Sequence, residues 1–265
     1  MTTDGPGRGA EDGDVNMIER LRARVRAVAS ESGLLSAPVQ VEVKRMPPEA
    51  AIGDTADRDY PIWKGKEGIV EARVLGGTGQ AFTPAPEEFR GDLTDLLSAE
   101  LAGAGSESLR NRGLLVAASN ALCSHLRLAH GMLHCRDDGP RECANELSTM
   151  LGGLEPMPAG IALIGCQPRM VEAIAARYPL RVTDLDPDNI GKHIGGVEIE
   201  GEERTDEVLA WCDLALVTGT TLVNGTIDRF LSAGRPVIFY GITIAGAASL
   251  CGLSRFCPKA IEPAV

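Results

Sequence analysis

Long hydrophobic runs are missing from this 265-residue chain. No apolar run approaches the roughly 18 residues that a membrane-spanning helix needs. The opening residues, MTTDGPGRGAEDGDVN, also lack the basic and apolar regions of a secretory signal. The sequence therefore predicts a cytoplasmic protein with no membrane partner.

Basic residues are also few: the chain has 26 Lys and Arg residues against 37 Asp and Glu residues. The formal net charge is −11 and the pI is near 4.9, so the long-range field of the protein repels phosphate backbones. This excludes nucleic acid as an expected partner. The hydrophobic content of 44% and charged content of 24% are ordinary for a folded soluble protein. The length suits two modest domains.

Two nucleotide-binding signatures are absent. No G-x-G-x-x-G follows the first strand of the second half, and no G-x-x-x-x-G-K-[ST] occurs anywhere. A nucleotide cofactor thus has no motif to support it. The seven cysteines are an odd number in a chain without a secretory signal, which argues against a disulfide framework. Thiol chemistry, metal ligation and plain burial remain open for them.

The first part of the chain predicts an α+β domain. Residues 1–15 are rich in Gly, Asp and Thr and predict a disordered lead. Within 16–150, a helix begins near Asn16, VQVEVKRM alternates as a strand does, and EGIVEARVL and GQAFTPA predict a hairpin. Two helices follow, FRGDLTDLLSAELAG and SLRNRGLLVAASNALCSHLRL. The second has a nearly all small or apolar centre, which indicates burial.

Residues 151–265 predict a second domain. From Gly160 onward, short apolar strands alternate with helical stretches. Parallel neighbours need such crossover connections, so this pattern indicates a parallel sheet. The expected fold class is α/β, with the α+β domain followed by a Rossmann-like, doubly wound domain.

One strand of that sheet ends in an unusually polar segment, LVTGTTLVNGTID. In a parallel sheet, ligands bind where loops leave the carboxyl ends of strands. The glycines permit close approach of a ligand, and the hydroxyl and amide groups lie beside a predicted helix N-terminus that favours anions. Helix capping alone is the alternative. The candidate ligand-binding residues here are Thr218, Gly219, Thr220, Thr221, Asn224, Gly225 and Thr226.

Two other strand ends meet the same edge. Asp184 and Asp186, followed by Asn189, end the second strand, where acids often contact ribose hydroxyls. Capping or solvation of these acids is the alternative. Cys166 follows the first strand, and either a reactive thiol or simple packing would explain it.

A cluster of cysteines and histidines lies between Cys123 and Cys143, and it holds three of the chain's four histidines. Thiolates and imidazoles suit zinc, nickel, copper or iron, including an iron–sulfur cluster. The spacing matches no standard finger, so burial in helices is the alternative. The candidate metal ligands are Cys135, Cys143, His134 and, if the two domains pack together, Cys257; the roles of Cys123, His125, His130 and His193 stay open.

Several motifs together resemble a known family. SNAL at the buried helix, IGCQP after the first parallel strand and above all VTGTTLVNGTID are similar to a two-domain prokaryotic family to which heavy-metal chelation is ascribed. HCRDDGPREC, DLDPDNIG and VIFYGITIAGAASLCGLSRFCP resemble one branch of it. The resemblance implies an N-terminal domain like that of enolase, a Rossmann-like second domain and the handling of a metal.

Two functions follow as hypotheses. The favoured one is a protein that binds a soft metal or metal complex, with a small anionic ligand at the strand edge. The alternative is an enzyme, a transferase or lyase, acting on a small molecule or nucleoside-type ligand in the same cleft. Its candidate polar groups are Asp184, Asp186, Asn189, Lys192, His193, Asn224 and Asp228. We also expect a homo-oligomer, because small α+β domains of this kind often self-associate.

Overall fold

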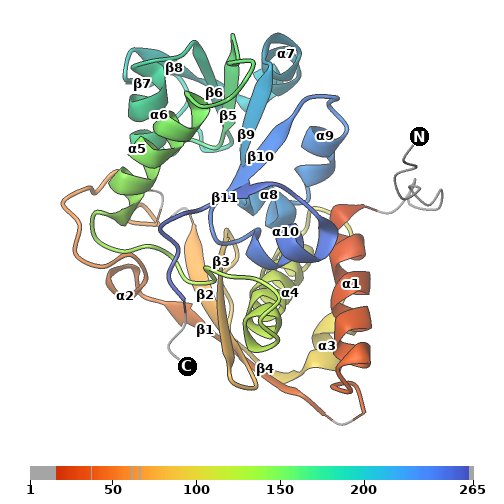
Figure 1. Cartoon of the computed structure of the whole chain (residues 1–265). Coiled ribbons are helices and arrows are strands. Elements are labelled where there is room, and N and C mark those ends of the chain that lie inside the picture. The colour runs from red at the N-terminus through yellow and green to blue at the C-terminus, as the bar shows by residue number, and fades with distance from the viewer. Residues whose placement is uncertain (1–15, 37, 61, 66, 263–265) are drawn as a thin grey trace, which may run out of the picture.

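The computed structural model describes residues 16–36, 38–60, 62–65 and 67–262 and contains two sheets with helices around and between them (Figure 1). A small antiparallel sheet comes first and a larger, mostly parallel sheet second, so the predicted fold class is confirmed. The predicted disordered lead, residues 1–15, lies outside the described residues. Within the described part, no helix has the length and apolar character needed to cross a membrane.

The antiparallel sheet has the strand order β3-β2-β1-β4. Its strands are β1 Gln40–Met46, β2 Gly68–Val74, β3 Gly77–Thr83 and β4 Phe89–Asp92. The predicted hairpin is present as β2 and β3, which turn at residues 75–76. Strand β4 corrects the prediction that a helix begins at residue 89: it pairs with β1, and the helix begins only at Leu93. Pairing there satisfies the backbone groups of β1 that would otherwise form an open edge.

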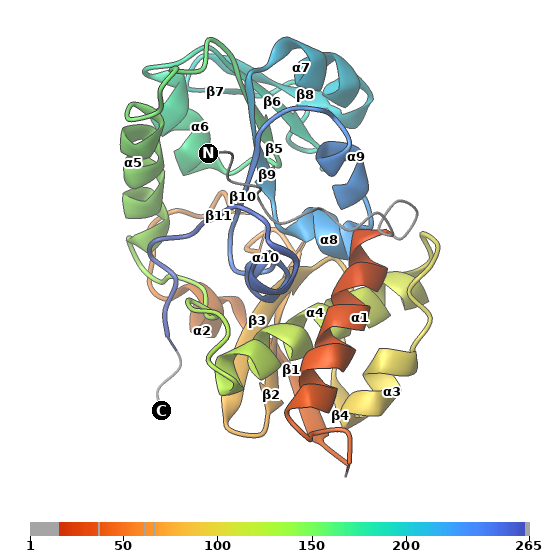
Figure 2. The same ribbon diagram turned by 45° about the vertical axis from the view of Figure 1, so that its right-hand side comes forward.

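The helices of the first part are α1 Met17–Glu31, α2 Pro48–Ile52, α3 Leu93–Ser98 and α4 Ser106–His125. Helix α1 begins after Asn16, as predicted, and the Asn16 side chain accepts a hydrogen bond from the backbone N–H of Glu19 (3.1 Å). Helix α4 is buried over most of its length, also as predicted. It lies between β3 and the second part of the chain, so no broad face of it meets water (Figures 1 and 2).

The second sheet has the order β11-β10-β9-β5-β6-β8-β7. Its strands are β5 Ile161–Ile164, β6 Leu180–Asp184, β7 His193–Ile194, β8 Val197–Gly201, β9 Leu214–Thr218, β10 Val237–Tyr240 and β11 Arg255–Phe256. All pairs are parallel except β7 with β8. The chain runs outward from β5 to β8 on one side, then returns to β9 on the other. The switch point of the sheet therefore lies between β5 and β9.

Helices cover both faces of this sheet (Figure 2). They are α5 Gly139–Leu151, α6 Pro168–Ala175, α7 Thr205–Trp211, α8 Thr220–Asn224, α9 Ile227–Leu231 and α10 Ala245–Cys251, with a 3-10 turn η1 at Glu202–Arg204. Alternate residues of β5 enter different cores: Ile161 and Leu163 pack with α5 and α6, whereas Ala162 and Ile164 pack in the core shared with α4. Helix α5 thus packs on the parallel sheet, and a domain boundary at residue 150 stays a prediction.

Candidate functional site

A cavity of about 640 Å³ lies at the carboxyl edge of the parallel sheet, where this edge faces the antiparallel sheet. Its wall combines the ends of β5, β6 and β9 with the Cys/His-rich segment, the end of β3 and the segment between α2 and β2. Most of the wall is apolar, with polar groups at a few places. Sites for small organic ligands have this character and span roughly 300–1,000 Å³. The cavity is therefore the candidate functional site.

The floor of the cavity is the switch point between β5 and β9. Gly165 follows β5 with a φ of 92°, and a Cβ there would come within 2.8 Å of the Thr218 side chain. Only glycine suits both this conformation and this close approach. The hydroxyl of Tyr240 donates to the backbone oxygens of Ile164 (3.1 Å) and Gly165 (2.8 Å). Tyr240 of β10 thus contacts the end of β5 at the base of the cavity.

The polar segment after β9, here called the threonine edge (Thr218–Thr226), lines the cavity with six of its residues. A short helix, α8, already starts at Thr220 inside this segment, and α9 follows it at Ile227. Some polar groups serve local structure: the Thr221 hydroxyl donates to the Thr218 backbone oxygen (2.7 Å). The hydroxyls of Thr218 and Thr220 lie 3.1 Å apart and share a hydrogen bond. Gly225 is exposed outside the cavity, where it ends α8 in the left-handed conformation (φ 76°).

The acids after β6 line the cavity and also shape its loops. The carboxylate of Asp184 accepts hydrogen bonds from the backbone N–H groups of Cys166 (2.5 Å) and Asp186 (2.7 Å). Asn189 is buried, and its Oδ1 lies 3.5 Å from the Lys64 Nζ. Burial, with Asp184 beside it, raises the pKa of Cys166 to about 12. Cys166 is therefore a protonated thiol at neutral pH, which disfavours the reactive role considered for it.

Three cysteines from separate segments share one wall of the cavity, here called the thiol corner (Cys135, Cys143 and Cys257). Burial raises the pKa of each, and Cys257 lies close enough to raise the pKa of the other two by charge repulsion. These are the cysteines that the sequence analysis proposed as ligands, and the packing of α5 and the C-terminal segment brings them together. Their role as ligands stays a prediction.

His134 lines the same cavity and packs edge-on against Phe82, with ring centroids 5.1 Å apart. Burial lowers the pKa of His134 to about 4, so the imidazole is neutral at neutral pH. Its Nδ1 is buried and has no hydrogen-bond partner among the described residues. A buried imidazole nitrogen without a partner is available to a ligand or metal.

The remaining histidines and two further cysteines lie away from the cavity. His125, His130 and His193 are exposed, and none of them lines it. Cys123 is buried in α4 and Cys212 is buried before β9, where its thiol donates to the Leu209 backbone oxygen (3.5 Å). These residues therefore fit packing or surface positions.

Glu67 is a site residue that the sequence analysis missed. It enters the cavity wall from the loop before β2 and faces Asp184 and Asp186. Burial, and then repulsion by these two carboxylates, raises the pKa of Glu67 to about 7. In the sequence, Glu67 follows the lysine- and glycine-rich stretch WKGK. Such a stretch is typical of an ordinary polar loop and does not indicate a functional site. A carboxyl group with a near-neutral pKa in a cavity is typical of functional sites.

The pKa of Glu67 leads to a pH-dependent stability prediction. The folded-state pKa lies above the unfolded value, so stability is lost as pH rises from about 4.5 to about 7. Glu67→Gln should therefore raise the free energy of unfolding by about 1–2 kcal/mol at about pH 8, after allowance for partial exposure, and change little at about pH 4. Urea unfolding at both pH values measures this. The exposed Glu49→Gln is the control, and an equal gain in both variants would contradict the prediction.

The segment between α2 and β2 is held to helices α5 and α6 by ion pairs. Asp57 pairs with Arg141 of α5 (3.0 Å) and with Arg169 of α6 (3.5 Å). Arg169 also pairs with Asp59 (2.7 Å). Tyr60 and Glu67 belong to the same segment, and both line the cavity. The ion pairs therefore help to fix this part of the cavity wall.

Comparison with known proteins bears on this site. Residues 158–252 match the DUF364 family, whose description is "Putative heavy-metal chelation". The predicted family resemblance is confirmed. The DUF364 match contains the β5 and β9 strand ends, the acids after β6 and the threonine edge, and it excludes all three residues of the thiol corner. No curated protein matches the chain.

Two solved DUF364 structures are similar to the chain, and each is described as a protein of unknown function. One, from Pyrococcus horikoshii, has 15% identity and a TM-score of 0.49, with 86% of this chain and 79% of that one covered. The other, from Desulfitobacterium hafniense DCB-2, has 15% identity and a TM-score of 0.46, with 71% and 73% covered.

Proposed function

We propose that the cavity binds a soft transition-metal ion at the thiol corner, together with a small organic ligand of that metal along the threonine edge. The observation that carries the proposal is the convergence of Cys135, Cys143 and Cys257 on one cavity wall from three separate segments. Thiolates select zinc, copper, nickel or iron over hard cations. The family description points to the same class of ligand.

The types of donor fit a soft metal better than their present spacing does. His134 supplies a neutral imidazole whose Nδ1 has no described partner, and the cysteines supply thiols. Yet among the described residues no three His, Cys, Asp or Glu side chains are grouped closely enough to hold a metal ion. Binding therefore has to draw the side chains together. A metal that arrives with ligands of its own needs fewer donors from the protein, which favours a metal complex over a bare ion.

The charge of the cavity also favours a cation. Its described lining holds the acids Glu67, Asp184, Asp186 and Glu202 against one guanidinium, that of Arg229, and Asp184 and Asp186 raise the pKa of Glu67 by charge repulsion. A bare anion beside them would be repelled, whereas a metal ion supplies positive charge and allows an anionic ligand to follow it. The hydroxyls of Thr218 and Thr220 would then contact that ligand. Each thiol that binds the metal releases a proton, so affinity should rise with pH.

Metal analysis of protein purified without oxygen and without an affinity tag tests this proposal. We expect zinc, nickel, copper or iron in the wild type, and at least about tenfold less in Cys135→Ser and in Cys143→Ser, since losing even an outer-shell partner costs about 10- to 100-fold in affinity. Labile sulfide would identify an iron–sulfur cluster. Cys123→Ser is the matched control, because Cys123 is equally buried and lies outside the cavity. Folded, metal-free protein in every form, or equal metal in all of them, would refute the proposal.

The near-neutral pKa of Glu67 favours a second candidate function. An acid–base group of this kind suits a transferase or lyase acting on a small molecule in the same cavity. In that case Glu67→Gln would abolish turnover of a substrate while the metal content stays at the wild-type level. A Glu67→Gln variant that loses its metal instead would favour binding as the role of this residue.

A further inference from the structure

Three carboxyl groups meet on one side of the cavity, here called the acid wall (Glu67, Asp184 and Asp186). Glu67 comes from the loop before β2, whereas Asp184 ends β6 and Asp186 follows it, so two distant segments bring the charges together. The backbone N–H groups of Cys166 and Asp186 each bind one oxygen of the Asp184 carboxylate, and each oxygen keeps a further lone pair. The acid wall is therefore an ordered set of hydrogen-bond acceptors that faces the cavity.

The basic groups near the acid wall contact other parts of the chain. Among the described residues, no lysine or arginine lowers the pKa of Glu67 or forms an ion pair with Asp184. Arg229, the one guanidinium in the described lining, pairs with an aspartate of α7 (2.7 Å). Lys64 is exposed, and its Nζ contacts the Oδ1 of Asn189 (3.5 Å). The described chain thus leaves the charge of Glu67 and Asp184 to a ligand.

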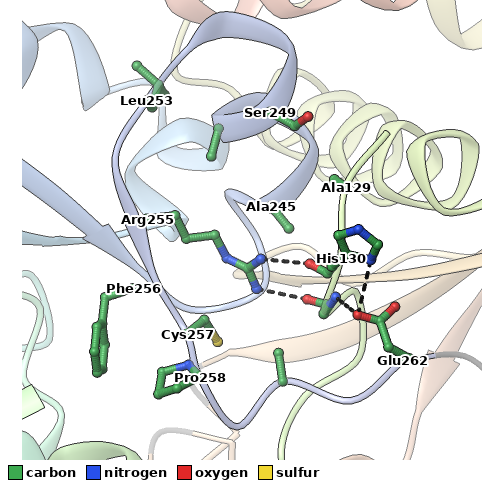
Figure 3. A pocket seen from close by; sticks show the side chains of 13 residues that line it. Ala129, His130, Ala245, Ser249, Leu253, Arg255, Phe256, Cys257, Pro258 and Glu262 are labelled. Carbon is green, nitrogen blue, oxygen red and sulfur yellow. Dashed lines mark hydrogen bonds and ion pairs between the residues drawn. The ribbon is translucent and has the colours of Figure 1, made fainter. Parts of the chain in front are cut away.

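A second depression, formed by the segment after α4, by α10 and by the chain after it, shows the opposite arrangement (Figure 3). Its guanidinium, that of Arg255, donates to the backbone oxygens of His130 (2.9 Å) and Gly131 (2.8 Å). Its carboxylate, that of Glu262, accepts from the backbone N–H of Gly131 (2.6 Å) and lies 3.6 Å from the His130 Nδ1. The charged groups of this depression bind the chain itself, so the cavity with the acid wall is the stronger ligand site.

The cavity holds another polar group without a partner. The Nδ1 of His134 is buried and has no hydrogen-bond partner among the described residues. Buried polar groups are normally satisfied by protein, water or a ligand. Burial also lowers the pKa of His134 to about 4, so the neutral imidazole does not repel a cation. Independently of the acids, His134 therefore marks this cavity as a place for a polar ligand.

The cation that fits the acid wall is organic. Among the described residues, no three His, Cys, Asp or Glu side chains are grouped closely enough to hold a metal ion, and this includes the acid wall. An ammonium group needs no such closed shell, because its N–H groups donate to separate acceptors in different directions. Most of the remaining cavity wall is apolar, which suits the carbon body that carries such a group.

We propose that the organic ligand of this cavity carries a protonated amine, which the acid wall binds through charge-assisted hydrogen bonds. This rests on the part of the proposed function in which the cavity takes a small organic ligand, and not on the metal. None of the three acids is among the groups that raise the pKa of Cys135 or Cys143, so the acid wall and the thiol corner are separate. Where Glu67 is protonated before binding, its proton passes to the solvent.

Three probes of similar shape and different charge test the amine assignment. They are phenethylamine, phenethyl alcohol and phenylacetate, titrated by calorimetry into the metal-free full chain at about pH 8. Phenethylamine should bind at least about tenfold more tightly than the alcohol, and phenylacetate more weakly than both, because hydrogen bonds between charged partners are the stronger kind. Glu67→Gln should reduce the preference for the amine at least about threefold and leave the affinity for the alcohol unchanged. Glu202→Gln removes the same charge from an exposed residue of the lining and should change neither.

The pH dependence of amine binding is a second readout. Glu67 faces Asp184 and Asp186 and also raises the pKa of the Tyr240 hydroxyl on β10. Its own pKa is about 7, so its carboxylate is available above that pH and is lost below it. From about pH 6 to about pH 8, the affinity for phenethylamine should therefore rise by up to about tenfold in the wild type and stay nearly constant in Glu67→Gln.

The outcomes separate the two proposals. Alcohol or phenylacetate that binds as tightly as the amine, or equal effects of Glu67→Gln and Glu202→Gln, would refute the amine assignment alone. Binding of none of the three probes would refute the organic ligand of the proposed function and the amine assignment with it. A clear preference for the amine, in a protein that is metal-free in every form, would support the acid wall and refute the metal site alone.

Discussion

Asn120→Ala should lower the free energy of unfolding by about 3–5 kcal/mol. The Asn120 side chain is fully buried in α4, where its amide nitrogen donates to the backbone oxygens of Gln80 (2.8 Å) and Ile242 (3.1 Å). Its Oδ1 accepts from the backbone N–H of Gly246 (2.7 Å). Alanine would leave these groups buried without partners, at about 1–3 kcal/mol each. Urea unfolding of wild type and variant measures the loss.

Ser119→Ala is the matched control for this prediction. Ser119 is the neighbour of Asn120 and is also buried, but its hydroxyl donates only to the Leu115 backbone oxygen (2.6 Å) within the same helix. Its loss should cost about 1 kcal/mol or less. Similar losses in both variants would show that Asn120 does not link β3 to the loop before α10 in the way described.

Gly79→Ala should destabilise the protein by about 3 kcal/mol or more, because α4 lies directly on β3 at this point. A Cβ at Gly79 would come closer than 3.0 Å to the backbone of Asn120 and Ala121. These are backbone atoms in the middle of a buried helix, so no side-chain rotation relieves the clash. Relief requires the helix to move away from the sheet, which opens the shared core. Thermal and urea unfolding measure the effect.

Gly76→Ala is the corresponding control, three residues earlier in the hairpin turn. Its Cβ would approach only the His125 Nδ1, at an ordinary 3.8 Å. The stability should change by less than about 1 kcal/mol. If Gly76→Ala were as destabilising as Gly79→Ala, loss of glycine itself rather than the packing of α4 would be the cause.

Local patterns predicted most of the longer elements, and they missed several short ones. Apolar periodicity located α1, the β2–β3 hairpin and the alternation of strands and helices after Gly160. It missed β4, Phe89–Asp92, which has no apolar alternation and exists as a strand only because it pairs with β1. Short edge strands such as β7 and β11 were missed for the same reason, since pairing rather than side-chain pattern defines them.

The sequence by itself determined the strand-end position of the threonine edge, because the end of a strand and the residues after it are neighbours in the chain. It also marked Cys135, Cys143, His134 and Cys257 as candidates by residue type. Only the tertiary structure decided that these side chains share one cavity and that Glu67 faces Asp184 and Asp186 within it. Both facts depend on segments far apart in the chain packing together, and burial and charge repulsion act through that packing alone.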